Sequence, residues 1–443
     1  MDSHFFPPDY IAIARQRWGP LAEERLAALQ TPSIKSIRRH PDKFIVSSEW
    51  PLTPVPWCER GFYVPEEARF ITDPAWHAGA YYVQEASSMV FAEVFKQLGP
   101  FDRALDLSAA PGGKSTLLLD YLAPQGVLVS NEPDAARSAI LVENLMRRGD
   151  VRVISTRQWS KFFAENARGL FDVVLVDAPC SGEGMFRKEP AARKQWKPSL
   201  LDQCMRTQSA ILPEAVQTVA PGGYLLYSTC TFHAGENEEM VAAHLPDVGF
   251  SPVHIALPEE WGFVQDSKGL GWYAYPARVK GEGFYFSVWK NEALTHGPKS
   301  PKSVKRGAPD CDWSPWLKGL DVTPGTSADR QVILGSEGIW QMQGWWEKWR
   351  PLMVGIMPGE EKGKQCIPAH GLALMAGVQP EIIFEVSKEE ALQYLRGQPL
   401  TPKEDWTLGY GLVRWEGLGL GWLNHLGSRT NNYLPKTWRI LHY

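Results

Sequence analysis

The sequence lacks the features that define several large classes of protein. No apolar run reaches the length of a membrane span. Residues 1–8 contain neither a basic n-region nor an apolar h-region, so we expect no secretion signal. The six cysteines are widely scattered, with no CxxC pair. We therefore expect reduced thiols in a cytoplasmic protein, with neither a disulfide framework nor a zinc site.

The chain also lacks the excess of positive charge that is typical of many nucleic-acid-binding proteins, because its formal net charge is −4. Basic residues are nevertheless concentrated locally, in Lys35–Lys43, Arg187–Lys197 and Lys299–Arg306. A solvated surface explains any one such stretch. A local patch matters more for binding than the sum of charges, so the net charge does not exclude a nucleic-acid partner.

The length and composition indicate a soluble globular chain of several domains, with 443 residues, of which 44% are hydrophobic and 22% charged. Residues 1–75 predict a small α+β unit. Strand-like and helix-like segments then alternate over residues 76–292, which predicts an α/β, Rossmann-like, doubly wound parallel sheet. The Pro/Ser/Lys-rich residues 293–309 predict a linker. A small intermediate domain over 310–370 and a β-rich domain over 371–443, typical of a small β-barrel, complete the expected organisation.

Individual segments carry these expectations. We expect strands at residues 104–107, 127–131, 151–154, 171–176, 225–227 and 283–289, and helices at residues 10–29, 84–98, 113–122 and 134–148.

A glycine turn follows the first of these strands and could bring the backbone close to a ligand. The turn has neither the GxGxxG nor the GxxxxGK[ST] pattern, which disfavours NAD and ATP and favours S-adenosylmethionine. Glu132 ends the next strand, where a carboxylate can accept hydrogen bonds from both ribose hydroxyls. A plain tight turn and a helix N-cap are the ordinary alternatives for the turn and for Glu132. The candidate cofactor residues of the turn are Ser108, Ala109, Ala110, Pro111, Gly112, Gly113 and Lys114.

Two cysteines stand just after predicted strands, Cys180 in Asp177-Ala178-Pro179-Cys180 and Cys230 in Ser228-Thr229-Cys230. In an open α/β sheet, residues at the carboxyl ends of strands meet in one crevice. A thiolate can add to carbon 6 of a pyrimidine and make carbon 5 nucleophilic. Such chemistry needs a nucleophile, a hydrogen-bonding partner for the base, and a group that resolves the adduct. Asp177, Cys180 and Cys230 are candidates for all three roles, whereas inert buried thiols are the ordinary alternative.

These motifs resemble those of the RNA cytosine-5 methyltransferases of the Nol/Nop/Sun family. The similar segments of the core are Leu105–Thr116, Asp177–Gly184 and Ser228–Thr231. Trp76–Met89 resembles the family segment that precedes the cofactor domain, and Gly281–Phe284 resembles part of the family's closing strand. The resemblance covers nearly the whole chain and is most specific in the core.

Longer motifs are similar to one bacterial branch of that family, the RsmF-like proteins that methylate small-subunit ribosomal RNA. Asp177–Lys188 resembles that branch in the core. Gly409–Val413 and Asn432–Lys436 look like hallmarks of its C-terminal RNA-binding domain of the PUA fold. The resemblance implies small-subunit ribosomal RNA or its assembly intermediate as partner, S-adenosylmethionine as cofactor, no membrane association, and a cytoplasmic monomer.

The resemblance also implies roles for individual residues. Cys230 would be the nucleophile, Cys180 would assist release, and Asp177 would contact both the cofactor and the target base. Ser108–Lys114 would hold the methionine part of the cofactor and Glu132 its ribose. Arg137, on the helix after Glu132, is a weaker candidate for cofactor binding, for which an ordinary surface arginine is the equal alternative.

One position departs from the family pattern. Many members carry an Asp after the third strand that holds the adenine amino group, but here Ile154–Arg157 occupies that place. The resemblance therefore leaves the adenine partner undefined, with a backbone or hydroxyl group as the candidate replacement.

Two other functions remain open from the sequence. A DNA cytosine-5 methyltransferase would use Cys180, in its Pro-Cys motif, as the nucleophile. A non-catalytic RNA-binding ribosome-assembly factor could keep the same fold. The Thr229-Cys230 pair and the PUA-like tail favour RNA over DNA. The intact Asp177, Cys180 and Cys230 argue against a non-catalytic factor.

Overall fold

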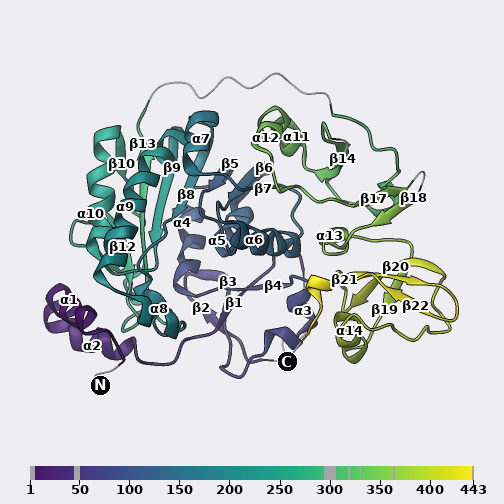
Figure 1. Ribbon diagram of the computed structural model, residues 1–443, viewed down its shortest axis with the longest axis horizontal. Coiled ribbons are helices and arrows are strands. Elements are labelled where there is room, and N and C mark those ends of the chain that lie inside the picture. Colours follow the sequence, from purple (N-terminus) through teal and green to yellow (C-terminus); the bar gives the residue numbers. More distant parts are fainter. Residues whose placement is uncertain are drawn as a thin grey trace.

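A sheet of parallel strands lies at the centre of the computed structural model, which describes residues 5–43, 50–293, 306–317, 320–329, 331–362 and 365–441 (Figure 1). The neighbouring parallel strands follow the order β9-β8-β5-β6-β7. Their bounds are β5 Phe101–Asp106, β6 Leu122–Asn131, β7 Val153–Thr156, β8 Phe171–Asp177 and β9 Val219–Thr229. The doubly wound sheet predicted from the sequence is therefore confirmed.

Antiparallel strands extend this sheet beyond β9. The predicted strand at residues 283–289 is β13, Phe284–Asn291, and it runs antiparallel to β9. Further antiparallel strands pair with it or follow it, namely β10 Phe250–Pro252, β12 Gly271–Ala274 and β11 Val264–Gln265. The sheet is mixed rather than purely parallel.

Helices cover both faces of the central sheet, and alternate residues of each strand face opposite sides. In β8, Val173 and Leu175 join the core on one face, while Val174 and Val176 join the core on the other. The first face packs against α4 Phe91–Leu98, α5 Gly113–Leu118 and α6 Ala135–Arg148. The second packs against α7 Ser160–Asn166, α9 Pro198–Ala215 and α10 Glu238–His244. A short helix, α8 Pro190–Gln195, precedes α9.

The N-terminal segment consists of two helices followed by a small sheet. The helix expected at residues 10–29 is divided into α1 Pro8–Trp18 and α2 Ala22–Ala28, because Gly19 has a φ of +50°. The small sheet has the order β2-β3-β1-β4. Its strands are β1 Ser36–Arg39, β2 Thr53–Val55, β3 Cys58–Tyr63 and β4 Tyr81–Val83, with α3 Pro74–His77 before β4.

The segment that we expected to form a small intermediate domain, residues 310–370, adds one strand to the central sheet. Its buried residues belong partly to the core of that sheet and partly to a separate cluster shared with the C-terminal segment. Strand β16, Met353–Val354, pairs antiparallel with β7. Trp349 packs against Phe163 and Phe171, with ring centroids 5.7 and 6.3 Å apart. The other elements of this segment are β14 Thr323–Thr326, β15 Val332–Gly335, α11 Glu337–Gln341, α12 Gln343–Trp349, β17 Gly359–Lys362 and β18 Gln365–Pro368.

The C-terminal segment forms a sheet of order β19-β20-β21-β22. Its elements are α13 His370–Ala373, β19 Ile383–Glu385, α14 Lys388–Leu395, β20 Gly409–Trp415, β21 Leu418–His425 and β22 Thr430–Asn432. Among the described residues β22 does not pair with β19, so the strand pairing does not close the barrel that we expected. Residues of this sheet share a hydrophobic core with the N-terminal sheet, for example Phe384 with Ile37 and Tyr81, and Figure 1 shows the two units side by side near α3.

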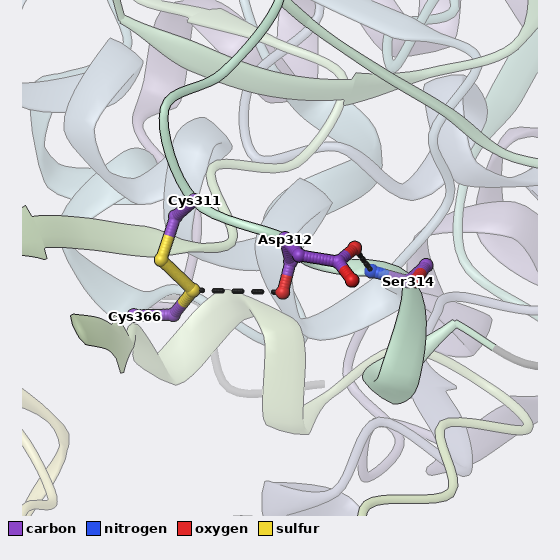
Figure 2. The surroundings of a disulfide bond; sticks show 4 residues. All are labelled: Cys311, Asp312, Ser314 and Cys366. Carbon is purple, nitrogen blue, oxygen red and sulfur yellow. Dashed lines mark hydrogen bonds between the residues drawn. A yellow bond between two sulfur atoms is a disulfide. The ribbon is translucent and has the colours of Figure 1, made fainter. Parts of the chain in front are cut away.

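The expectation that all six cysteines are free thiols was wrong. Cys311 and Cys366 form a disulfide, with Cα atoms 5.9 Å apart, and Figure 2 shows it beside Asp312. The two cysteines are 55 residues apart in sequence, and no local motif marks them as partners. Cys58, Cys180, Cys204 and Cys230 are free.

Most of the linker expected at residues 293–309 lies outside the described residues. Within the described part of the chain, no helix is both long enough and apolar enough to cross a bilayer.

Candidate functional site

A cleft of about 960 Å³ opens at the carboxyl edge of the parallel strands. It is lined by residues that follow five different strands, among them Ser108, Glu132, Trp159, Asp177, Cys180 and Cys230. This is the edge at which open α/β sheets bind ligands. The structure thus brings together both candidate cysteines, Asp177, Glu132 and the first residue of the predicted cofactor turn.

The two cysteine sulfurs are in contact inside this cleft. Their Sγ atoms are 3.2 Å apart, and the Cys230 backbone N–H donates to the Cys180 Sγ at 3.3 Å. The hydrogen bond with Cys230 and then burial raise the pKa of the Cys180 thiol well above its usual value. Cys180 therefore stays protonated at neutral pH and can donate its proton toward the sulfur of Cys230.

A buried carboxylate, Glu236, fixes the loop that carries Cys180. It accepts hydrogen bonds from the backbone N–H and hydroxyl of Ser181 at 2.9 and 2.5 Å, and from the Gln208 side chain at 3.1 Å. The Ser181 and Thr231 hydroxyls are 2.8 Å apart and join the two cysteine loops. Sequence reasoning missed Glu236, although an acid so soon after a candidate nucleophile is a signal that could have been followed.

A second buried carboxylate, Glu183, connects the same loop to the N-terminal helix. Arg17 of α1 donates to both carboxylate oxygens, at 2.7 and 3.2 Å, and the Phe232 backbone N–H donates at 3.1 Å. Arg17 and Glu183 are 166 residues apart in sequence, so no local pattern predicts the pair.

Asp177 is the last residue of β8, opposite Ser228 of β9, and is held by two donors. The Lys114 ammonium is 2.7 Å from its Oδ2, and the Ser228 hydroxyl donates to its Oδ1 at 2.7 Å. Burial lowers the pKa of Lys114, but the ion pair with Asp177 outweighs burial and leaves that pKa above its usual value. Lys114, which we expected to hold the cofactor directly, thus orients Asp177.

The predicted cofactor turn lies between β5 and α5. Gly112 has a φ of +113°, which favours glycine, and α5 begins at the next residue. Of the described residues Ser108 to Lys114, Ser108 alone lines the cleft. Behind the turn, burial raises the pKa of Asp106 to about 7, although the Ser115 hydroxyl donates to this carboxyl at 2.7 Å.

Glu132 lines the cleft, and its two carboxylate oxygens differ in their partners. Its side chain is buried and its Oε1 accepts the Asp134 backbone N–H at 3.1 Å. Its Oε2 has no hydrogen-bond donor among the described residues and lies 3.4 Å from the Arg137 guanidinium. Arg137 also donates to the Ala110 carbonyl at 3.0 Å. A buried acceptor without a donor, in a residue that lines the cleft, fits a ligand with hydroxyl groups.

At the position that lacks the family's adenine-binding Asp, the two hydroxyl groups differ. The Thr156 hydroxyl is buried and donates to Asn131 at 2.9 Å, whereas the buried Ser155 hydroxyl has no hydrogen-bond partner among the described residues. Trp159 follows β7, lines the cleft and is 75% exposed. Sequence reasoning missed this residue, because one tryptophan among nineteen carries little signal.

Family models match three parts of the chain. Residues 96–290 match "16S rRNA methyltransferase RsmB/F", residues 6–86 match the N-terminal domain of 16S rRNA methyltransferase RsmF, and residues 381–440 match the methyltransferase RsmF PUA domain. The three matched regions include the cleft, the small N-terminal sheet and the C-terminal sheet.

Individual relatives agree with these matches. Ribosomal RNA small subunit methyltransferase F from Enterobacter sp. (strain 638) is 30% identical, over 98% of this chain and 96% of its own length. A methyltransferase homolog protein from Pyrococcus horikoshii is 25% identical, with a TM-score of 0.53 over 64% of this chain and 99% of its own. NSun6 from the same organism, crystallised with SFG, shares the fold at 18% identity, with a TM-score of 0.55 over 65% of this chain and 99% of its own. The chain therefore belongs to the RsmF family of S-adenosylmethionine-dependent 16S rRNA methyltransferases.

Proposed function

We propose that this enzyme methylates carbon 5 of a cytosine in 16S ribosomal RNA, through a covalent bond between Cys230 and carbon 6 of the base. The observation that carries the proposal is the contact between the two thiols, at 3.2 Å, in the cleft that also contains Asp177 and Glu132. The RNA substrate is supported by the names of the family and its relatives. The proposal includes either naked RNA or an assembly intermediate as substrate and a cytoplasmic monomer as the working form.

The cysteines would divide the covalent chemistry between them. In this proposal Cys230 is the nucleophile, as the family resemblance implies, and Cys180, whose pKa is raised by the hydrogen bond with Cys230 and by burial, stays protonated beside it. The Cys230 thiolate adds to carbon 6, and the electron pair of the 5,6 double bond moves to carbon 5. After carbon 5 has gained its methyl group, a base removes the proton from carbon 5, the double bond forms again, and Cys230 leaves as a thiolate. Cys180, in contact with Cys230, assists this last step.

Asp177 would orient the target base. A carboxylate accepts a hydrogen bond from the exocyclic amino group of cytosine. Lys114 and Ser228 hold Asp177 at the end of β8, and Ser228 belongs to β9, the strand that precedes Cys230. The position of Asp177 relative to the nucleophile is therefore fixed before the RNA binds.

S-adenosylmethionine, when bound, supplies an electrophilic methyl group. Glu132 would accept hydrogen bonds from its ribose, and the turn from Ser108 to Lys114, with Asp177, would hold its methionine part. Trp159 would stack on its adenine and so replace the family's Asp. The support for Trp159 is its exposed ring in the cleft beside the strand that ends in Glu132. Arg137 would act through Glu132 and the Ala110 carbonyl as a positioning residue.

The other parts of the chain would bind RNA. We assign RNA binding to residues 1–75 and to the PUA-like residues 371–443, methyl transfer to residues 76–292, and supporting roles to residues 293–309 and 310–370. The family match over residues 381–440 supports the PUA-like assignment.

Two measurements on RNA test the proposed function. Bisulfite mapping of 16S ribosomal RNA from a deletion strain should show the loss of at least one 5-methylcytosine, which the wild-type gene restores and a Cys230→Ala gene does not. Purified enzyme should incorporate methyl groups into that RNA in vitro. If the map does not change and the purified enzyme methylates a DNA duplex instead, the DNA methyltransferase alternative is correct.

A further inference from the structure

A small pocket rich in arginine lies on the other side of the cofactor turn from the cleft. It lies between β1 and β4 of the N-terminal sheet and the C-terminal turn of α6. Its lining includes Arg38, Arg39, Tyr82, Asn144, Arg147 and Arg148. We refer to it below as the arginine pocket.

Positive charge in this pocket exceeds the negative charge that could balance it. Asp120 is shared among three arginines, Arg38 at 3.3 Å, Arg148 at 2.5 Å and the neighbouring Arg60 at 3.1 Å. Arg39 and Arg147 have no carboxylate within ion-pair distance among the described residues, and the Nε atoms of both are buried without a hydrogen-bond partner. Both arginines are half-buried, so their guanidinium groups can still reach a ligand, and a bound anion would supply the missing counter-charge.

Aromatic rings, and not acids, lie against these two guanidinium groups, and Arg147 also donates a hydrogen bond to the Asn144 side chain. Arg39 lies over Phe62, with 4.7 Å between the guanidinium carbon and the ring centroid. Arg147 lies at 4.6 and 4.8 Å from the rings of Trp76 and Trp438. Cation–π contacts orient a guanidinium without neutralising it, so both groups keep their full charge for a ligand.

A buried lysine and a histidine lie beside the pocket. Lys43 is buried and donates to the backbone carbonyls of Ala78 and Arg147, at 2.9 and 2.8 Å. Burial, followed by the neighbouring charges of Arg148 and Arg147, lowers the pKa of Lys43. The same surroundings lower the pKa of His40, whose ring nitrogen bonds the Arg148 carbonyl, so His40 adds no charge at neutral pH.

The size of the pocket restricts what can enter. Its free volume of about 20 Å³ admits one oxygen-sized group and excludes a base or a sugar. A phosphate oxygen is small enough to enter this volume, and it carries the negative charge that arginine binds well.

We propose that the arginine pocket binds a backbone phosphate of the RNA substrate, an inference that rests on the proposed function. The residues of the pocket also support the cofactor turn. Arg38 donates to the Gly113 carbonyl at 3.3 Å and Asn144 donates to the Pro111 carbonyl at 2.8 Å. Trp438 brings the C-terminal unit to the same place. A phosphate bound here aligns the RNA backbone with the cofactor turn, the N-terminal sheet and the PUA-like unit together.

The test uses the full-length protein with Arg39→Gln, because Arg39 makes no ion pair or hydrogen bond that the change would break in the described structure. Affinity for 16S ribosomal RNA is measured over a range of salt concentrations. Loss of one phosphate contact should weaken binding at low salt by about five- to tenfold and reduce the slope of log K against log salt by about 1. The Arg39→Lys protein should retain most of the wild-type slope of log K against log salt. Arg168→Gln, an exposed arginine between α7 and β8, is the matched control and should change neither quantity.

A second experiment uses inorganic phosphate to distinguish an RNA phosphate from a free anion as the ligand of the pocket. Phosphate should compete with RNA at the wild-type pocket and lose that effect in Arg39→Gln. If phosphate raises the unfolding temperature of the wild type alone while RNA affinity and slope are the same in both proteins, the pocket binds a free anion and our proposal is wrong. Equal slopes in Arg39→Gln and Arg168→Gln would also overturn it. RNA binding is measured here without methyl transfer, so failure of the proposed catalytic function would be seen separately.

Discussion

The two ends of the cleft differ in how completely their polar groups are paired. At the thiol end, around Cys180 and Cys230, Glu236 accepts three hydrogen bonds and Glu183 is held by Arg17. At the other end, around Glu132 and Trp159, where we propose that the cofactor binds, a buried carboxylate oxygen has no hydrogen-bond donor among the described residues, with only the Arg137 guanidinium 3.4 Å away, and a large ring is exposed. We call this the cofactor end.

This difference indicates what the protein fixes in advance and what a ligand completes. Covalent chemistry needs a nucleophile held in one geometry before the substrate arrives, and paired buried groups provide that. A cofactor that binds and leaves in each cycle needs groups that gain partners only on binding. Changes at the thiol end should therefore affect the chemical steps, and changes at the cofactor end should affect affinity.

The largest effect should come from replacing each cysteine by alanine. Cys230→Ala should abolish methyl transfer and give no protein–RNA adduct, because no bond to carbon 6 forms. Cys180→Ala should still allow attack and methylation but release the product poorly, so a covalent complex should accumulate. Denaturing gel electrophoresis with substrate RNA distinguishes the two variants, and the double variant is the control. An adduct with Cys230→Ala but none with Cys180→Ala would assign the nucleophile to Cys180.

The next effect concerns the carboxylate beneath the Cys180 loop. Glu236→Gln replaces an acceptor of three hydrogen bonds by a group that brings its own N–H donors toward Ser181. Hydrogen bonds to a charged group contribute about 1.5–3 kcal/mol, so we expect kcat to fall about tenfold or more. Cofactor affinity, measured by calorimetry, should not change. Glu239→Gln, at an exposed position in the next helix, α10, is the matched control. A change in cofactor affinity with normal kcat would contradict the division between the two ends.

At the cofactor end, Glu132→Ala should weaken S-adenosylmethionine binding by roughly tenfold or more, because the ribose hydroxyls lose a charged acceptor worth about 1.5–3 kcal/mol. Calorimetry measures this, with Glu239→Ala as control. The double variant Cys180→Ala/Glu132→Ala should still form the Cys230 adduct when the cofactor is supplied in excess. Unchanged affinity would remove Glu132 from the cofactor site.

The smallest effect should come from Trp159. Stacking on a base contributes about 1–3 kcal/mol, and a ring as exposed as this one should lie near the lower limit, which is about fivefold in affinity. Trp159→Ala should therefore weaken binding of S-adenosylmethionine and of S-adenosylhomocysteine equally, and Trp159→Phe should retain most of the affinity. Quenching of tryptophan fluorescence by the cofactor should decrease in both variants. Normal affinity in Trp159→Ala would leave the adenine without an assigned partner.

The parts of the structure that sequence predicted well depend on local patterns. The central strands, the glycine turn and the two cysteines each follow from short segments, and the topology of an open sheet brings such segments to one edge. That the thiols lie together at this edge could therefore be expected before any coordinates were known. The roles of these residues remain predictions.

The parts that sequence did not predict depend on contacts between distant residues. Arg17 binds Glu183 across 166 positions, Cys311 joins Cys366 across 55, and β16 pairs with β7. Nothing in the segments themselves specifies these partners. Trp159 was missed for another reason, since whether a tryptophan is exposed or buried depends on what packs around it.

The core shared by the N-terminal and C-terminal sheets has a consequence for synthesis of the chain. Ile37 and Tyr81 leave the ribosome hundreds of residues before Phe384, Leu395 and Leu423, against which their cluster packs. Domains at the start of a chain usually fold while the rest is still being made. Here the apolar face of the first sheet stays uncovered until the final segment has been translated. The two ends of the chain therefore complete their folding together. A protein chain that terminates before the final segment keeps an exposed, aggregation-prone face.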